Sequence, residues 1–267
     1  MAVNKMGANE KRMPAVFVGH GSPMLALQHD SVTEGLAQMG ERIVAEFGKP
    51  RAILAVSAHW FTRGTFVQTT ATPRQIYDMY GFPEELYEVK YPVAGSPELG
   101  KRVQELLCDR VSANDDWGID HGVWTPLVHM FPQADVPIVE FSVNKNLDAA
   151  ASYELGRALA PLRDEGYLVL GSGNTVHNLG AVLWDSEQGT PQTDAFDDAV
   201  IKAVEARDDA TALAYEKLPY ARYAVPTPDH YLPLAYILGA AEGETPVVFN
   251  RVRTLGSIAM TGFAFGL

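Results

Sequence analysis

The sequence contains a single cysteine, Cys108, among 267 residues. One cysteine cannot form an internal disulfide, and without a Cys-x-x-Cys pair the chain offers no thiolate site for structural zinc or an iron–sulfur cluster. Cys108 ends the apolar stretch 103–108, so we expect it to be a small residue of the core. Any metal chemistry must therefore rely on nitrogen and oxygen ligands.

Long apolar runs and clusters of basic residues are also missing. No stretch of about 18 consecutive apolar residues is present, so we expect no membrane span. Residues 1–13 are polar and do not read as a signal peptide, which makes the cytoplasm the expected location. The formal net charge of -12 disfavours nucleic acid and anionic membrane surfaces as partners.

Short apolar runs alternate with amphipathic segments from Pro14 onward, which predicts an α/β fold. We expect a flexible tail at 1–12 and a single catalytic domain at 13–267, with a central, mostly parallel or mixed β-sheet and helices on both faces. The expected strands are 15–18, 51–57, 65–70, 137–143, 167–170, 246–249 and 258–263. Asp148 is a plausible N-cap for one helix, Thr193 or Asp194 for another, and 230–241 should be a buried helix.

Three of the seven histidines directly follow expected strands. His20 follows 15–18, His59 follows 51–57, and His177 follows 167–170 after a glycine-rich turn. Open α/β sheets bind ligands beyond the carboxyl ends of their strands, so these side chains are expected to meet in one crevice. Neutral imidazole is a common ligand for iron(II), zinc and copper, and imidazoles without a nearby thiolate favour an open, catalytic metal site.

Two further histidines start helical segments. His230 follows Asp229 in a proline-rich approach, and it is interpreted either as a metal ligand or as a helix-start residue that bonds the backbone. His121 follows Asp120, a candidate cap, and at a helix N-terminus a neutral imidazole can face a substrate. His129 is interpreted as structural, and His29 is left without a role.

Five segments in order resemble those of one known family. They are Gly-His-Gly-Ser-Pro at 19–23, Ser-Ala-His-Trp at 57–60, Asp-His-Gly-Val-Trp-Thr-Pro-Leu at 120–127, Gly-Ser-Gly-Asn-Thr-Val-His-Asn at 171–178 and Pro-Asp-His-Tyr at 228–231. They resemble the class III extradiol ring-cleavage dioxygenases, and within them the 4,5-DOPA dioxygenase extradiol branch, over nearly the whole chain from Pro14 to Gly266.

The resemblance implies one divalent metal per chain, with His20 and His59 as ligands. The well-known ring-cleaving members have a glutamate as third ligand, whereas the matching segment here carries His230. Iron(II) is implied for dioxygenase activity, and three histidines also suit zinc. The resemblance makes His177 the catalytic acid–base or an additional ligand, and His121 a catalytic group facing substrate or oxygen. The implied substrates are a DOPA-like catechol and O2.

Two other functions remain open from the residues alone. One is a zinc-dependent hydrolase or lyase on the same scaffold, with metal-bound hydroxide as nucleophile. The other is a binding protein that kept the cleft and lost the chemistry. The aromatic residues Trp60, Trp124, Tyr80 and Tyr231 are interpreted either as a pocket wall or as core packing. The chain is expected to be a monomer or a homodimer.

Overall fold

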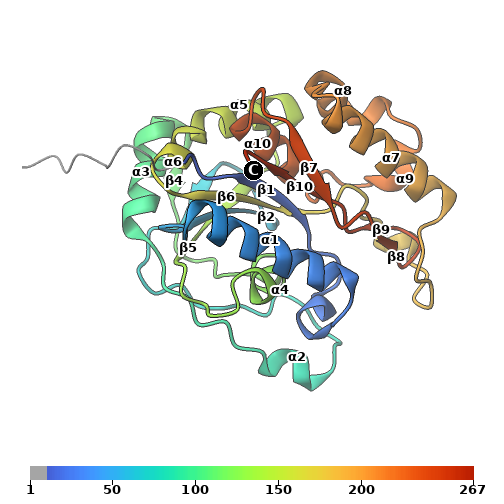
Figure 1. The fold of residues 1–267 in the computed structure, drawn as a ribbon, viewed down its shortest axis with the longest axis horizontal. Helices are drawn as coiled ribbons and strands as arrows, with labels where there is room; N and C mark the ends of the chain where they lie inside the picture. The colour runs from blue at the N-terminus through green and yellow to red at the C-terminus, as the bar shows by residue number, and fades with distance from the viewer. Residues whose placement is uncertain (1–10) are drawn as a thin grey trace, which may run out of the picture.

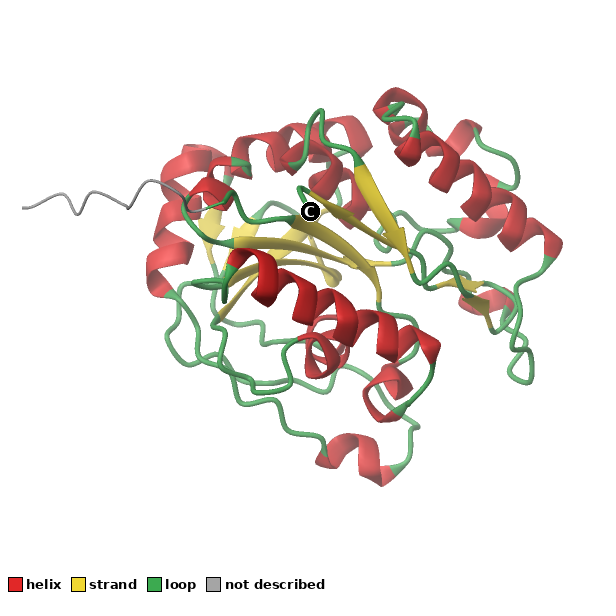
Figure 2. Cartoon of the chain, in the orientation of Figure 1, coloured by secondary structure: helices red, strands yellow, loops and turns green. Residues whose placement is uncertain are grey.

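A computed structural model describes residues 11–267, and its centre is a mixed β-sheet (Figures 1 and 2). The eight-stranded sheet has the order β4-β3-β5-β2-β6-β1-β10-β7. The strands are β1 (Ala15–Gly19), β2 (Ile53–Thr62), β3 (Phe66–Val67), β4 (Ser112–Ala113), β5 (Ile138–Asn144), β6 (Leu168–Gly173), β7 (Pro246–Phe249) and β10 (Gly262–Phe265), and β8 (Arg253–Thr254) pairs separately with β9 (Ile258–Ala259).

The middle of the sheet is parallel and its flanks contain antiparallel pairs. Strands β5, β2, β6 and β1 run in the same direction, so their carboxyl ends lie along one edge. Strand β10 is antiparallel to β1 and β7, and β3 is antiparallel to β5. The predicted mixed α/β sheet is confirmed, and its parallel centre is the part that brings strand ends together.

Helices cover both faces of the sheet (Figure 2). Side chains alternate along each strand: Ala15 and Phe17 join a core cluster with α3, α5, α7 and α10, whereas Val16 and Val18 join a cluster with α1 and α4. The helices are α1 (Ser31–Phe47), α2 (Glu84–Glu88), α3 (Pro97–Leu107), α4 (His121–Met130), α5 (Ala149–Leu159), α6 (Pro161–Asp164), α7 (Pro191–Glu205), α8 (Asp209–Leu213), α9 (Ala221–Ala224) and α10 (Leu232–Ala240), with short 3-10 turns η1 (Pro23–Leu27), η2 (Cys108–Arg110), η3 (Leu179–Ala181) and η4 (Tyr215–Lys217).

Several details differ from the sequence predictions. Strand β2 runs on to Thr62, so His59 lies inside it and does not follow it, and the expected strand 65–70 is only the short β3. The expected strand 258–263 is two strands, β9 and β10, because the chain leaves one sheet and enters the other around Met260. Helix α7 starts earlier than predicted, since the Thr190 hydroxyl accepts from Thr193 N and caps it. Cys108 is exposed and has a positive φ at the end of α3, so its prediction as a core residue was wrong.

The expected tail falls largely outside the described residues, which begin at Lys11. Where the description starts, Arg12 donates to Ala160 O at 3.2 Å and lies 3.6 Å from the Asp164 carboxylate. Within residues 11–267, no helix combines the length and apolar character that crossing a membrane requires.

Candidate metal and active site

Five histidines converge at the carboxyl edge of the parallel strands. His20 directly follows β1 and His177 follows β6, while His59 lies within β2, so neighbouring strands supply three of the rings. His121 is the first residue of α4, and His230 lies two residues before α10. The sequence prediction that distant stretches bring these imidazoles into one crevice is therefore met by the geometry.

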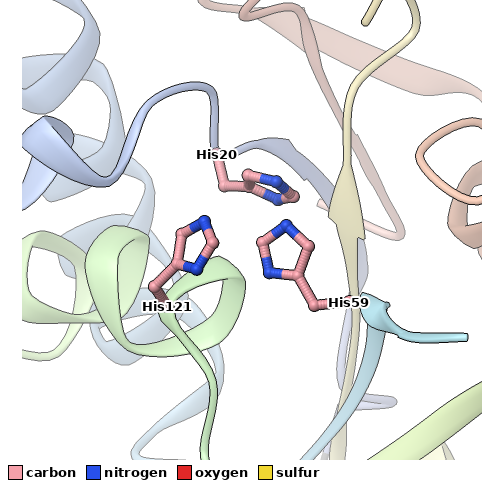
Figure 3. A group of neighbouring side chains, drawn as sticks. All are labelled: His20, His59 and His121. Atoms are coloured by element: carbon pink, nitrogen blue, oxygen red, sulfur yellow. The ribbon is translucent and has the colours of Figure 1, made fainter. Parts of the chain in front are cut away.

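The distances between ring centres define how closely they gather. His20 lies 4.7 Å from His59 and 5.2 Å from His230, and His59 lies 5.2 Å from His230. His121 lies 4.0 Å from His59 and 6.0 Å from His20 (Figure 3). His177 stacks on His230 at 3.6 Å with only 4° between the planes. His20, His59 and His230 therefore form a central group, with His121 next to His59 and His177 next to His230.

An irregularity in β2 presents His59. The pairing of β2 with β5 shifts register between Ser57 and Phe61, and His59 lies inside that shift. A bulge bends a strand and changes the direction in which a side chain points, and such bulges are frequent beside active sites. The bulge is the reason that an imidazole near the end of a buried strand can face the crevice.

Two glycines let the histidine segments approach closely. A Cβ on Gly173 would lie 2.2 Å from His230 O, so only glycine at this end of β6 allows the backbone before α10 to pass. A Cβ on Gly122 would lie 3.0 Å from the His59 ring. These small residues explain, in physical terms, why glycines surround the histidines in the sequence.

Hydrogen bonds fix which nitrogen of His20 and His230 faces the crevice. The Ser172 hydroxyl donates to Gly122 O, so it must accept from His20 Nδ1, 2.9 Å away, and the lone pair of His20 is left on Nε2. His230 Nδ1 likewise bonds the Asp229 carboxylate. Both Nε2 atoms are buried and have no hydrogen-bond partner within the described chain. Buried acceptors in this state are the atoms that a metal ion would satisfy.

Carboxylates lie next to Nδ1 of the other two rings, His121 and His59. His121 Nδ1 lies 3.0 Å from Asp78 Oδ1. His59 Nδ1 lies 3.4 Å from both Asp78 Oδ2 and Asp120 Oδ1. A carboxylate behind a metal-binding histidine orients the ring and makes the opposite nitrogen a better ligand. The Nδ1 atoms of His20, His121 and His230 therefore have a hydrogen-bonding group behind them, whereas His59 Nδ1 lies near two carboxylates without a hydrogen bond within the described residues.

The protonation of the rings suits metal binding. Burial lowers the pKa of His20 well below its usual value, and burial also lowers the pKa of His230, so both are neutral. For His59, burial alone would lower the pKa, but Asp120, Asp78 and Asp229 outweigh it and raise it. The negative field that favours a proton on His59 would equally favour a divalent cation.

The spacing of His20, His59 and His230 fits one ion. With a metal–nitrogen bond of about 2.1 Å, ring centres lie about 3.2 Å from the ion, and rings separated by 90–110° at the ion lie about 4.5–5.3 Å apart. The three separations of 4.7, 5.2 and 5.2 Å fall in that range. The separations of His121, 4.0 and 6.0 Å, fall outside it.

The distances between ring nitrogens alone favour a different third ligand. Nitrogens of His20, His59 and His121 lie within 4.8 Å of one another, and this group does not include His230. The ring spacing and the partner-free Nε2 of His230 favour His230 as the third ligand, because a side-chain rotation moves a nitrogen more readily than a ring centre. His121 and His230 both line the neighbouring cavity, so access to that cavity does not distinguish them.

A cavity of about 530 Å³ opens beside these rings. Its wall includes four of the histidines, together with apolar and aromatic side chains from several loops; these are His59, His121, His177, His230, Tyr80, Phe82 and Trp184. The volume lies in the range of small-molecule sites. Of the four aromatic residues singled out in the sequence, Tyr80 lines this cavity, whereas Trp60, Trp124 and Tyr231 are buried in the core.

Several functional groups escaped the sequence analysis. Asp78 and Trp184 lie in segments without a recognisable motif, and Ser172 lies in the motif 171–178 without any sign in the sequence of its bond to His20; these roles depend on contacts across the fold. Asp120 does precede α4, yet its side chain does not cap the helix and instead accepts from Ser57 Oγ at 2.7 Å. His129 bonds Leu25 O at 2.8 Å, in keeping with a structural role.

Comparisons with known proteins agree with this geometry. Residues 14–265 match the family described as the catalytic LigB subunit of aromatic ring-opening dioxygenase. A 4,5-DOPA dioxygenase extradiol from Escherichia coli K12 is 40% identical, covering 96% of this chain and 95% of that protein, and its counterpart from Beta vulgaris is 38% identical, covering 88% and 90%.

A solved structure shares the fold. The crystal structure of an uncharacterized protein from Escherichia coli K12 superposes with a TM-score of 0.81 at 38% identity, covering 95% of this chain and 99% of that one. The family match spans the sheet, the five histidines and the cavity together. This chain therefore belongs to the family of the catalytic LigB subunit of aromatic ring-opening dioxygenases and is an extradiol ring-cleaving enzyme with a single non-haem metal.

Proposed function

We propose that the chain cleaves the ring of a DOPA-like catechol with O2, using iron(II) held by His20, His59 and His230. The observation that carries the ligand set is the pair of buried, partner-free Nε2 atoms on His20 and His230, at ring spacings that suit one ion shared with His59. Bound iron(II) would supply a Lewis acid for the catechol oxygens and an electron path to O2.

The protein's own residues would orient the substrate and move its protons. His177 lines the cavity, and burial, followed by the neighbouring His230, lowers its pKa to about 2, so its imidazole is neutral and presents an unprotonated nitrogen to a bound catechol. His121 is also neutral, because burial lowers its pKa, and Asp78 fixes its ring. We propose His121 as a hydrogen-bonding group for substrate or oxygen, while Phe82 and Trp184 offer aromatic faces at the cavity wall.

Oxygen consumption tests this function directly. Protein reconstituted anaerobically with iron(II) is expected to take up one O2 per catechol cleaved, and the product should absorb as a ring-opened semialdehyde. Zinc-loaded protein is expected to consume no oxygen, because zinc has no redox chemistry. Catechol-independent hydrolysis by the zinc form, without oxygen uptake by the iron form, would instead favour a hydrolase.

The charge of the cavity bears on the substrate. A second cavity of about 570 Å³ shares Ser22, Phe82, Trp184 and Leu255 with the first. Carboxylates of Asp30 and Glu187 line this second space, and no lysine or arginine from residues 11–267 lines either one. DOPA, for which these relatives are named, carries both an ammonium and a carboxylate group on its side chain, and of the two only the ammonium would meet groups of opposite charge here. We propose that the substituent of the substrate extends past Phe82 into the second cavity.

A charge series of substrates tests that placement. Dopamine and 3,4-dihydroxyphenylacetate have side chains of similar size and opposite charge. We expect kcat/KM to favour dopamine by about tenfold or more, because a carboxylate would enter a space that offers acidic groups and no cation. The comparison uses initial rates of oxygen uptake at low ionic strength, with 4-methylcatechol as the uncharged control. Equal kcat/KM values for the charged pair would contradict the placement and leave ring cleavage itself untouched.

A further inference from the structure

Glu140 is a fully buried carboxyl group within the sheet, and the proposed reaction does not use it. It lies on β5 with none of its surface exposed. It shares a face of the strand with Ile138, which packs in the core cluster that contains Val123 and Leu127 of α4. Burying a carboxyl group in such a setting is unfavourable unless hydrogen bonds compensate. Within the described residues Oε1 accepts a hydrogen bond and Oε2 has no partner, so the contacts made through Oε1 are the ones that need an explanation.

Those partners form a closed circuit of hydrogen bonds. Glu140 N donates to Gln68 Oε1 at 3.1 Å, and Gln68 Nε2 donates to Trp117 O at 3.1 Å. Trp117 Nε1 donates to Asp120 Oδ2 at 3.0 Å, and Asp120 N donates to Glu140 Oε1 at 2.7 Å. The circuit ties β5, the residue after β3 and the segment that leads into α4 into one rigid unit.

The circuit ends at the histidines. Asp120 Oδ1 lies 3.4 Å from His59 Nδ1, and Ser57 Oγ donates to Asp120 Oδ2 at 2.7 Å and accepts from His59 N at 3.2 Å. The residue after Asp120 is His121, the first of α4. Whatever fixes the backbone of Asp120 therefore fixes the carboxylate behind one imidazole and the starting point of another.

We propose that Glu140 is a positioning residue of the metal centre, which acts through the backbone N–H of Asp120 to hold the carboxylate that orients His59. Glu140 itself contacts neither the metal site nor the cavity. The proposal rests on the proposed ligand role of His59, and it is tested by metal binding and ring geometry, without reference to ring cleavage.

The state of Glu140 indicates which substitution is conservative. Burial, and next the charge of Asp120, raise the pKa of Glu140 well above its usual range, which favours the neutral acid. Glutamine has the same length, is neutral and keeps a side-chain oxygen for Asp120 N. Methionine has a similar size and offers Asp120 N no comparable acceptor.

Metal affinity and the His59 ring are the readouts. We expect Glu140→Met and Gln68→Met to weaken zinc and iron(II) binding by about 10- to 100-fold in competition with a chromophoric chelator, the usual effect of losing a group that orients a ligand. Glu140→Gln is expected to stay within a few-fold of the parent protein. In the metal-free protein, the nitrogen-15 signals of the His59 ring are expected to shift in the two methionine variants and to be retained in Glu140→Gln.

A matched control separates positioning from general stability. Glu244 pairs with the buried Arg163, which bonds Met13 O at the opposite end of β1 from His20. Glu244→Met should lower stability and leave metal affinity unchanged. If Glu140→Met does not fold, Gln68→Met decides the question, since it opens the same circuit. Unchanged affinity and His59 signals in the folded methionine variants would overturn the proposal, as would an equal loss of affinity in Glu244→Met.

Discussion

Replacing His20, His59 or His230 by alanine is expected to abolish stoichiometric metal binding, whereas His121→Ala should retain it. Each of the first three rings lies at a spacing that suits a shared ion, and two of them present buried Nε2 atoms without a partner within residues 11–267. Losing a group that orients a ligand typically weakens metal binding by up to about 100-fold, so losing a ligand itself should weaken it by more. Metal content after dialysis and chelator competition measure the effect.

The same series decides which histidine is the third ligand. If His121→Ala loses the metal and His230→Ala keeps it, the group defined by the closest nitrogens is the site, and the ring-spacing argument is wrong. His129→Ala is the control, because His129 bonds Leu25 O within the fold. Thermal melting of each metal-free variant shows whether a loss of metal reflects the site or the fold.

The sequence predicted the sheet and the location of the site because both depend on local patterns. The parallel strands β1, β2, β5 and β6 appear as short apolar runs, and histidines that follow such runs must reach the same edge of the sheet. The His-containing motifs at residues 20, 59, 121, 177 and 230 further identified the family. These features can be predicted from the sequence because they do not depend on contacts between distant segments.

What the sequence could not predict depends on contacts between distant segments. The bulge that presents His59 arises from pairing with β5, and no residue pattern in β2 marks it. Asp78 lies 43 residues from the His121 ring it orients, and Ser172 lies 152 residues from His20. Trp184 reaches the cavity from a loop whose sequence has no motif. Such partners are chosen by the tertiary fold, so sequence periodicity carries no trace of them.

Glu140 shows the same limit in the core. From the sequence, 137–143 is an apolar strand interrupted by one acid, a pattern that does not reveal whether the acid is exposed at an edge or buried. In the fold β5 lies between β3 and β2, so the acid is enclosed, and within the described residues only its Oε1 has a hydrogen-bond partner. Burial, and not the residue type, turns it into a candidate support for the metal site.

Substituting His177 by phenylalanine is expected to reduce kcat by about 10²- to 10⁴-fold, the usual contribution of a general acid–base, while metal affinity changes little. Phenylalanine keeps an aromatic ring against His230, where the native rings stack at 3.6 Å and 4°, so the neighbouring ring should stay in place. What the variant loses is a nitrogen that lines the cavity and can exchange a proton with a bound catechol.

The two roles proposed for His177 give opposite results in this experiment. As an acid–base group, His177→Phe lowers kcat and keeps stoichiometric iron(II). As a ligand, the same change releases the metal. His129→Phe is the matched control, because it makes the same substitution at a histidine whose contact is Leu25 O and should leave kcat unchanged. A His177→Phe variant with full metal content and the parental kcat would remove His177 from the mechanism and leave His121 as the remaining cavity-lining imidazole outside the proposed ligand set within residues 11–267.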